Sequence, residues 1–320
     1  MTVRTVRGDV PAEALGRTLV HEHLILDSAL IRETMPHIHL HSVDDAVTEV
    51  SSCHEVGIGA MVDAMPAAGG RDPIKLAAIS EATGVHIIAT TGLHTPKYYG
   101  DHPWAVDINP SSLAQLFVDD IEVGIDANDH MAIDLDRTTI RAGIIKVATD
   151  EQGIDERAIR LFEAAVEAAQ RTHTPILTHT EDGIGALDQI ALFERLGFSL
   201  NRVVLSHTDK IIDPEYHEAI LATGVSVEYD QALRRIESSS NATSELIVEM
   251  VHRGYARQMM LGTDGARRSL WKSLGGSPGL AFMSGDLVDD LVSRGLEQGD
   301  LVAIFEDNPQ RFLDRGTEAA

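Results

Sequence analysis

Six residues able to bind a metal ion stand at or near the ends of short apolar runs. His21 and His23 end the first run, Gly-Arg-Thr-Leu-Val-His-Glu-His-Leu. Because side chains alternate between the two faces of a β-strand, residues two apart point the same way and both can reach one ion. His-x-His also suits two ordinary polar residues at a strand end, so this segment alone leaves both interpretations open. The other members of the group, each ending a later apolar run, are Lys146, His179, His207 and Asp264.

The residue types indicate which metal they would bind. Four histidines and one aspartate are ligands suited to Zn²⁺, with Mn²⁺ or Co²⁺ as alternatives. Their number exceeds what one catalytic tetrahedral site needs, which indicates two ions. Lys146 differs, because a protonated amine beside two cations would be repelled, and its neighbours Ile144, Ile145 and Val147 supply no counter-charge. A neutral, desolvated amine reacts with CO₂, so we expect Lys146 to be N6-carboxylysine, with its carbamate bridging the two ions.

These residues need a scaffold that brings the ends of separate strands together. Eight apolar runs of strand length are separated by helical patterns, as a parallel sheet of strand and helix units requires. The expected strands cover 16–24, 59–63, 85–92, 142–148, 174–179, 202–207, 224–229 and 258–264. The expected helices cover 42–55 with Ser42 as N-cap, 72–83, 111–123, 155–172, 188–196, 286–295 and 309–313, and loops are expected over 27–41 and 93–110.

The predicted fold class is α/β, with residues 1–320 forming a single (β/α)8 TIM barrel. The strand runs are almost continuously apolar, as expected for strands covered by helices outside and packed together inside. An open doubly wound sheet is the competing architecture, but it would not converge residues from the first, fourth, fifth, sixth and eighth strands. In a barrel the active site lies at the C-terminal ends of the strands, where all six candidate residues stand.

The composition limits the classes of partner and the cellular compartments that we expect for this protein. The 320-residue chain has a formal net charge of −24, which argues against nucleic acid and anionic membrane surfaces as partners. A single cysteine, Cys53, excludes an intramolecular disulfide. The polar N-terminal segment lacks the apolar core of a secretory signal, and no run approaches the roughly 18 apolar residues needed to span a bilayer. We therefore expect a cytoplasmic protein that acts on a small molecule.

The sequence resembles the phosphotriesterase-related branch of the amidohydrolase superfamily, which includes the phosphotriesterase-like lactonases. The matching segments occur in family order at 16–23, 142–149, 175–180, 206–209 and 261–264, and the similarity extends from about Thr5 to Phe312. The resemblance implies that His21, His23 and Asp264 bind a buried ion. It implies that His179 and His207 bind an exposed ion, and that carboxylated Lys146 bridges the two ions. Some relatives have Glu at the bridge, whereas this chain has Lys. Resemblance alone also implies a homodimer.

The expected mechanism is hydrolysis of an ester-like bond. Two neighbouring cations would lower the pKa of a shared water, and the exposed ion would polarise a carbonyl or phosphoryl oxygen. Asp264 would accept a proton from that water and pass it to the leaving oxygen, so Asp264 and Lys146 are the predicted catalytic residues. The resembled family divides between phosphotriester and lactone hydrolysis, and the choice of substrate must come from the loops.

Three cations close to predicted metal ligands indicate an anionic substrate group. Lys210 follows His207 by three residues, and Arg267 and Arg268 follow Asp264 by three and four. Arginine is well suited to bidentate binding of phosphate or carboxylate. The alternative is that these side chains pair with nearby acids or lie outside the pocket.

Two tyrosines are further candidates for contact with the substrate. Tyr98, in the loop over 93–110, could bring its hydroxyl to the exposed ion or to a substrate oxygen, or could simply pack over the barrel mouth. Tyr229 and Arg234, at and after the end of the seventh strand, are candidates of the same kind.

The sequence thus predicts a binuclear metal hydrolase that opens a lactone, specifically a sugar lactone carrying a phosphate or carboxylate group. The alternative within the same chemistry is a lactonase for uncharged lactones with promiscuous phosphotriesterase (aryldialkylphosphatase) activity. An alternative of another class is a catalytically silent protein that binds a small molecule. The complete ligand set argues against this last interpretation.

Overall fold

Eight parallel strands form a nearly closed barrel within the residues that this computed structural model describes, which are 1–100, 103–107, 109–132, 134–236 and 241–316. Each strand pairs with the next in the order β3 (Arg17–Glu22), β4 (Ile58–Asp63), β5 (His86–Gly92), β6 (Ile144–Thr149), β7 (Ile176–Thr180), β8 (Val203–Ser206), β9 (Ser226–Tyr229) and β10 (Met259–Leu261). Across the seam between β10 and β3, Thr263 N and Asp264 N donate to His21 O at 3.1 and 3.0 Å. The predicted TIM barrel is confirmed, and the open sheet is wrong.

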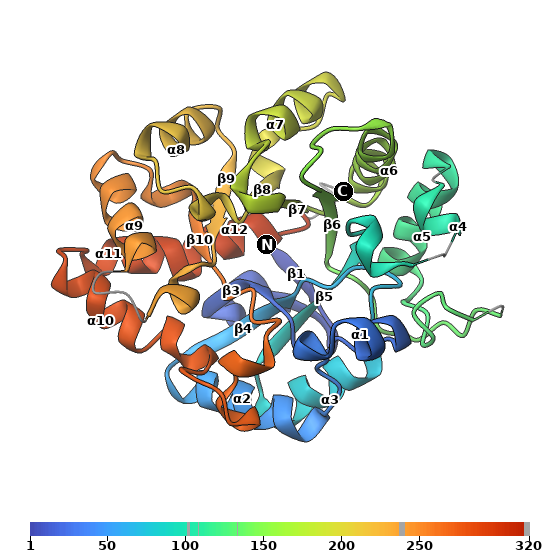
Figure 1. Cartoon of the computed structure of the whole chain (residues 1–320), viewed down its shortest axis with the longest axis horizontal. Coiled ribbons are helices and arrows are strands. Elements are labelled where there is room, and N and C mark those ends of the chain that lie inside the picture. Colours follow the sequence, from blue (N-terminus) through green and yellow to red (C-terminus); the bar gives the residue numbers. More distant parts are fainter. Residues whose placement is uncertain (101–102, 108, 133, 237–240, 317–320) are drawn as a thin grey trace.

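Helices surround the barrel (Figure 1). In chain order they are α1 (Ala29–Thr34), α2 (Val43–Glu55), α3 (Pro73–Thr83), α4 (Pro103–Val106), α5 (Pro110–Glu122), α6 (Glu156–Thr172), α7 (Ala186–Arg195), α8 (Pro214–Leu221), α9 (Ala242–His252), α10 (Asp286–Ser293), α11 (Gln298–Val302) and α12 (Asn308–Leu313). None of these helices, over the described part of the chain, is both long enough and apolar enough to cross a membrane.

Side chains cap the N-termini of two predicted helices. Ser42 Oγ accepts from Asp45 N at 3.2 Å at the start of α2, which confirms the predicted N-cap. Asp155 Oδ1 accepts from Ala158 N at 2.6 Å at the start of α6. Each cap satisfies a backbone N–H that the helix cannot pair internally, so these sequence signals locate the helices correctly.

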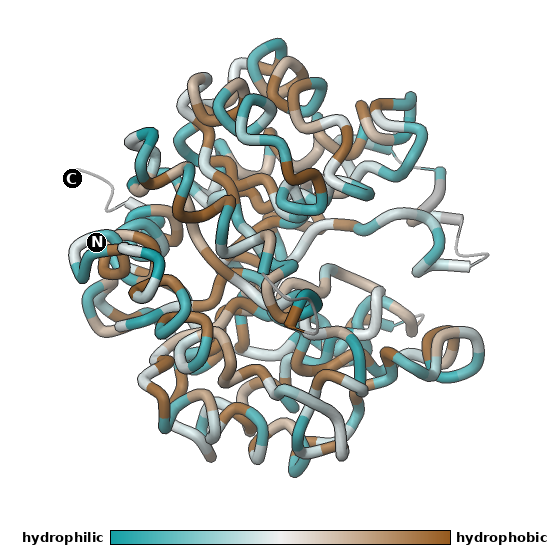
Figure 2. Tube along the Cα trace, turned by 60° about the vertical axis from the view of Figure 1, so that its left-hand side comes forward, coloured by the Kyte–Doolittle hydropathy of each residue, from teal (hydrophilic) through white to brown (hydrophobic). Residues whose placement is uncertain are grey.

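Two apolar clusters divide the core into an outer and an inner layer. The outer cluster fills the space between the strands and the helices. The inner cluster fills the barrel with residues from seven strands, namely Val20, Ala60, Val62, Ile88, Ile144, Leu177, Val204 and Met260. The hairpin of β1 (Thr2–Thr5) and β2 (Gly8–Pro11) adds Val3 to this cluster, and α12 adds Phe312 and Leu313. Figure 2 shows hydrophobic segments running through the middle of the molecule, and hydrophilic residues on many of the turns at its outside.

Some element boundaries differ from the sequence prediction. The expected loop over 27–41 contains α1, and the one over 93–110 contains α4, although residues 101, 102 and 108 lie outside the described residues. His23, His207 and Asp264 follow the strand ends instead of lying within them. His207 and Asp264 have φ values of 66° and 42°, and a left-handed backbone cannot continue a strand.

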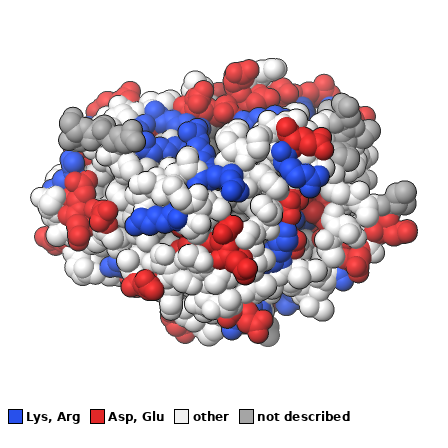
Figure 3. Space-filling model, turned by 60° about the horizontal axis from the view of Figure 1, so that its bottom comes forward, with Lys and Arg blue, Asp and Glu red and all other residues white. Residues whose placement is uncertain are grey.

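Charge is unevenly distributed over the surface. The chain carries a formal net charge of −24, yet Lys and Arg side chains gather on the face drawn in Figure 3, interrupted by acidic groups. A chain with this net charge can therefore still present local cationic surface.

Candidate metal centre and active-site cavity

A cavity of about 300 Å³ is lined by all six predicted metal ligands, which are His21, His23, Lys146, His179, His207 and Asp264. The alternation of the strands explains why two of them face it. Ile144 and Leu177 belong to the inner cluster of the barrel. Lys146 and His179 lie two residues further along the same strands, so their side chains face the barrel interior as well. The cavity therefore lies at the C-terminal ends of the strands.

The backbone around the cavity is unusually tight. A Cβ atom on Gly92, at the end of β5, would lie 1.9 Å from Lys146 O, so only glycine allows this approach to β6. His207 and Asp264 adopt positive φ without being glycine. Such conformations cost energy and concentrate at functional sites, where the surrounding structure maintains them.

One group of donors converges around His21. Its Nε2 lies 2.7 Å from Lys146 Nζ and 3.9 Å from Asp264 Oδ1. His23 Nε2 lies 3.3 Å from the same Asp264 oxygen. One ligand atom from each of His21, His23 and Asp264 lies within 4.8 Å of the others. These are the three residues predicted to hold the buried ion.

A second group contains His179 and His207, whose ring centroids are 4.5 Å apart. His179 Nε2 pairs with Glu181 Oε2 at 3.1 Å, and its buried Nδ1 has no hydrogen-bond partner among the described residues. His207 pairs through Nδ1 with Asp230 Oδ2 at 2.6 Å. Each imidazole therefore keeps one nitrogen that another ligand can take.

The donor set fits divalent metal ions. Imidazole nitrogens and carboxylates are both ligands for Zn²⁺ and similar ions. Leaving a buried polar atom such as His179 Nδ1 without a partner is costly, and a bound cation would recover that cost. The chain therefore has both the ligands and an energetic reason to bind metal here.

Burial sets the protonation states that metal binding requires. It lowers the pKa of Lys146 to about 8 despite nearby carboxylates. Burial, followed by the proximity of His207, lowers the pKa of His179 to about 3. Burial alone would raise the pKa of Asp264, but Arg234 and the imidazoles outweigh it and hold that pKa well below its usual value. The site thus presents a neutral His179 imidazole, an ionised Asp264 and a Lys146 amine that loses its proton more easily than usual.

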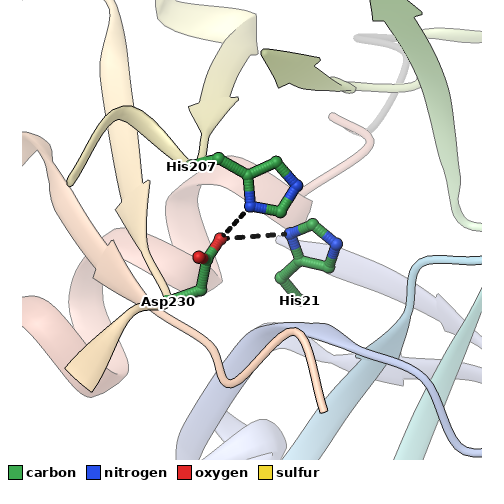
Figure 4. A group of neighbouring side chains, drawn as sticks. All are labelled: His21, His207 and Asp230. Atoms are coloured by element: carbon green, nitrogen blue, oxygen red, sulfur yellow. Dashed lines mark ion pairs between the residues drawn. The ribbon is translucent and has the colours of Figure 1, made fainter. Parts of the chain in front are cut away.

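Sequence reasoning missed two acids that support these ligands. Glu228 Oε2 lies 3.2 Å from His21 Nδ1, while Asp230 pairs with His207 and lies 3.8 Å from His21 Nδ1. Figure 4 shows Asp230 between the two imidazoles. Asp230 with the two histidines is also a possible three-ligand metal group. The signal was present, because Glu228-x-Asp230 has the same one-face spacing as His21-x-His23.

The predicted substrate contacts separate into two groups. Tyr98, Lys210 and Arg267 line the cavity, as does Arg234, whose Nη2 donates to Asp264 Oδ2 at 2.8 Å. Other residues of the cavity that the sequence did not single out include His37, His94, Lys97 and Glu181.

Arg268 and Tyr229 are not among the residues that line the cavity, which corrects the sequence prediction. Arg268 Nη1 donates to His39 O at 2.9 Å. Tyr229 is fully buried, and its hydroxyl pairs with His217 Nδ1 at 2.8 Å. The reason is strand alternation, because Tyr229 lies between Glu228 and Asp230 and therefore points away from them.

An eight-stranded barrel with candidate histidine and aspartate ligands at its C-terminal end is the arrangement typical of metal-dependent hydrolases of the amidohydrolase type. The model of the phosphotriesterase family matches residues 1–313. The phospho-furanose lactonase of Mycoplasmopsis synoviae is 28% identical over 97% of this chain and 91% of its own length. The aryldialkylphosphatase of Saccharolobus solfataricus is 24% identical over 96% of this chain and 98% of its own length.

Solved structures agree with this relationship. An amidohydrolase from Mycoplasma synoviae aligns with a TM-score of 0.89 at 27% identity, covering 98% of this chain and 91% of the other. The phosphotriesterase homology protein of Escherichia coli, complexed with phosphate in its active site, aligns with a TM-score of 0.83 at 26% identity, covering 94% and 99% of the two chains.

The chain belongs to the phosphotriesterase family. It is accordingly a hydrolase of ester bonds, the reaction class that lactonases and aryldialkylphosphatases share.

Proposed function

We propose that this protein is a binuclear metal hydrolase that opens a sugar lactone carrying a phosphate or carboxylate group. One observation carries the proposal. The cavity that holds the six predicted ligands is also lined by the cations Lys210, Arg234 and Arg267. His21 and Lys146 are fully buried, whereas Lys210 is half-buried and Arg267 is exposed, so cationic side chains stand nearer the mouth. An uncharged substrate would gain little from them.

The metal ions would be held by the residues described above. His21, His23 and Asp264 would bind one ion, His179 and His207 the other, and carboxylated Lys146 both; Zn²⁺ suits this set best, with Mn²⁺ or Co²⁺ as alternatives. When bound, such a pair polarises the scissile carbonyl and lowers the pKa of a water molecule. Carboxylation of Lys146 requires CO₂ and a deprotonated amine, and burial lowers the pKa of that amine to about 8.

Asp264 is the residue that moves the proton. Its pKa is held well below the usual value, so the carboxylate is ionised at neutral pH and carries no proton of its own before it takes one from the water. Arg234 donates to Asp264 Oδ2 at 2.8 Å and to Thr263 O at 3.0 Å, which fixes the carboxylate in the cavity. Asp264 then passes the proton to the ring oxygen as the lactone C–O bond breaks, and the product is a hydroxy acid.

His94 supplies a hydrogen-bond donor for the substrate. Its Nδ1 accepts from Thr95 N at 2.7 Å, so the ring proton must sit on Nε2. His94 lines the cavity beside His179, with ring centroids 4.6 Å apart, and no described residue bonds its Nε2. A donor in this position would bind a carbonyl or ring oxygen of the lactone.

A lactone panel tests the proposal. Matched sugar lactones with and without a phosphate group would be assayed with the metal-loaded wild type, Arg267→Ala and Arg268→Ala. The wild type should favour the phosphorylated lactone, and Arg267→Ala should reduce that preference about 10- to 100-fold, mainly through KM, because a hydrogen bond to a charged group is lost. Arg268→Ala is the matched control, since Arg268 is the adjacent arginine and donates to His39 O. His94→Gln should retain more activity than His94→Phe.

Each outcome bears on a different part of the proposal. If Arg267→Ala treats both lactones as the wild type does, the anion-binding role of Arg267 fails. If metal-loaded wild type hydrolyses no lactone, the function itself fails, and a binding protein becomes the better interpretation. The similarity to an aryldialkylphosphatase supports one second candidate, a lactonase for uncharged lactones with phosphotriesterase activity. Preference for an uncharged lactone, together with turnover of a neutral aryl dialkyl phosphate, would favour it.

A further inference from the structure

Strand β9 carries none of the predicted metal ligands, yet two fully buried carboxylates stand at its end. Glu228 and Asp230 are both 0% exposed. Tyr229 between them packs against His217. The two acids therefore face the barrel interior together, toward the histidines of the candidate metal centre.

The two acids approach different histidines from the same side. Glu228 Oε2 lies 3.2 Å from His21 Nδ1, and Asp230 Oδ2 lies 2.6 Å from His207 Nδ1. Each acid contacts Nδ1 and not Nε2 of its ring, and Figure 4 shows the second nitrogen of both rings directed away from Asp230. His21 Nε2 is the atom that lies 2.7 Å from Lys146 Nζ. The acids therefore hold each ring by the nitrogen remote from the ligand group.

This arrangement is expensive without a cation. A buried carboxylate is costly unless it is paired, and within the described residues every ion pair of Glu228 and Asp230 is with His21 or His207. Glu228 Oε1 is buried without a hydrogen-bond partner. The chain also keeps room for the pair, because a Cβ on Gly262 would lie 2.6 Å from Glu228 Oε1 and 2.8 Å from His21 Cβ. A purely structural role does not explain two such acids.

We propose that Glu228 and Asp230 are positioning residues that control the affinities of two different ions. Glu228 accepts from His21 Nδ1 and presents its Nε2 to the buried ion. Asp230 forms an ion pair with His207 Nδ1 and leaves its Nε2 for the exposed ion. A carboxylate behind a ligating imidazole fixes its tautomer and ring orientation and increases its basicity. This inference rests on the proposed binuclear centre.

The test measures metal affinity and does not need a substrate. Metal-free wild type, Glu228→Gln and Asp230→Asn would be titrated with Zn²⁺ against a chromophoric chelator, in the presence of bicarbonate, to obtain two dissociation constants. Each variant should weaken one of the two binding steps about 10- to 100-fold and leave the other within about 3-fold. In a His179→Ala background, which lacks a ligand of the exposed ion, Glu228→Gln should still weaken the remaining step.

Glu49→Gln is the matched control, because Glu49 is also a buried glutamate. It accepts from Ser273 N at 3.0 Å and Leu280 N at 2.8 Å and contacts no predicted ligand. This variant should leave both affinities unchanged while lowering the Tm of the metal-free protein. Metal-free Glu228→Gln should be at least as stable as metal-free wild type, since it removes a buried carboxyl group whose Oε1 has no hydrogen-bond partner.

Two results would overturn the inference. One is that Glu228→Gln binds both ions with wild-type affinity. The other is that it weakens both steps equally and destabilises the metal-free chain, as a structural residue would. If the wild type itself binds fewer than two ions, the proposed binuclear function fails, so the two failures are distinguishable.

Discussion

Two buried charged clusters lie beside the C-terminal end of the barrel, and they differ in how completely their atoms are paired. The first surrounds Arg71, which donates to Asp120 Oδ2 at 2.6 Å, Asp129 Oδ1 at 2.7 Å and Thr90 O at 2.5 Å. Asp120 also accepts from Thr91 Oγ1 at 2.9 Å and pairs with His130 Nε2 at 3.0 Å. Every charge in this cluster has an opposite charge in contact.

The candidate metal centre is the second cluster, and its pairing is incomplete. His23 Nδ1, His179 Nδ1 and Glu228 Oε1 are buried without hydrogen-bond partners in the described structure. Lys146 Nζ contacts an imidazole nitrogen instead of a carboxylate. Buried charge alone therefore does not mark a functional site. Buried ionisable groups that lack partners and converge on one cavity are a stronger indication, because they keep bonding capacity for a ligand.

The pKa shifts show the same contrast. Burial alone would raise the pKa of Asp120, but Arg71 and then His130 lower it to about 2. Burial lowers the pKa of Lys146 to about 8, and the surrounding carboxylates do not compensate. The Arg71 cluster stabilises its charges, whereas burial in the candidate metal centre destabilises the charged form of the Lys146 amine.

The largest expected effect comes from removing the predicted bridge. Lys146→Met should reduce kcat/KM for any accepted lactone by about a thousandfold or more, because both ions lose a shared ligand. The metal-free variant should be no less stable than metal-free wild type, since a buried amine is replaced by an apolar chain of similar length. Assays with metal analysis and thermal unfolding would measure both effects.

Lys146→Glu is the companion variant for the bridge. It supplies a carboxylate without CO₂, so part of the activity should return and should not depend on bicarbonate during metal loading. If Lys146→Met had wild-type activity, the predicted role of Lys146 as a bridging ligand would be wrong.

The Arg71 cluster should respond in the opposite way. Arg71→Met leaves Asp120 and Asp129 buried without their cation, so the free energy of unfolding should fall by about 3 to 5 kcal/mol. The Arg71→Met protein that remains folded should still bind metal with wild-type stoichiometry. Arg171→Met, which removes an exposed pair with Glu167, is the control and should cost less than about 1 kcal/mol. Urea unfolding and metal analysis would measure both properties of Arg71→Met. If this variant lost metal and kept its stability, the Arg71 cluster would support metal binding and not the fold, which would contradict the contrast between the two clusters.

A smaller effect is expected from acid. The pKa of Asp120 is about 2 in the folded chain against 3.8 for an unperturbed aspartate, so the unfolded chain binds the proton more readily. Asp120 should therefore contribute about 2 kcal/mol that is fully present above about pH 4 and is lost as pH falls toward 2. The stability difference between wild type and Asp120→Asn, measured by urea unfolding, should narrow below pH 4. A constant difference would contradict this assignment.

Features that depend on a single segment of the chain could be predicted from the sequence, whereas features that depend on contacts between segments could not. The barrel was predictable because each strand is a short apolar run and each helix shows its own periodicity and caps, as at Ser42. The six ligand candidates were predictable because they stand at or near the ends of those runs. The two acids behind the histidines carried a visible spacing signal, but only the neighbouring strand shows that Glu228 meets His21.

The amino-acid sequence by itself determined the barrel and the group of residues at its mouth, since both depend on patterns within one segment. Only the tertiary structure decided which neighbours face the cavity. Arg267 lines it and Arg268 does not, although they are adjacent in sequence. The choice depends on the left-handed backbone at Asp264 and on the path of the following loop, which long-range contacts such as Arg268 with His39 O hold in place.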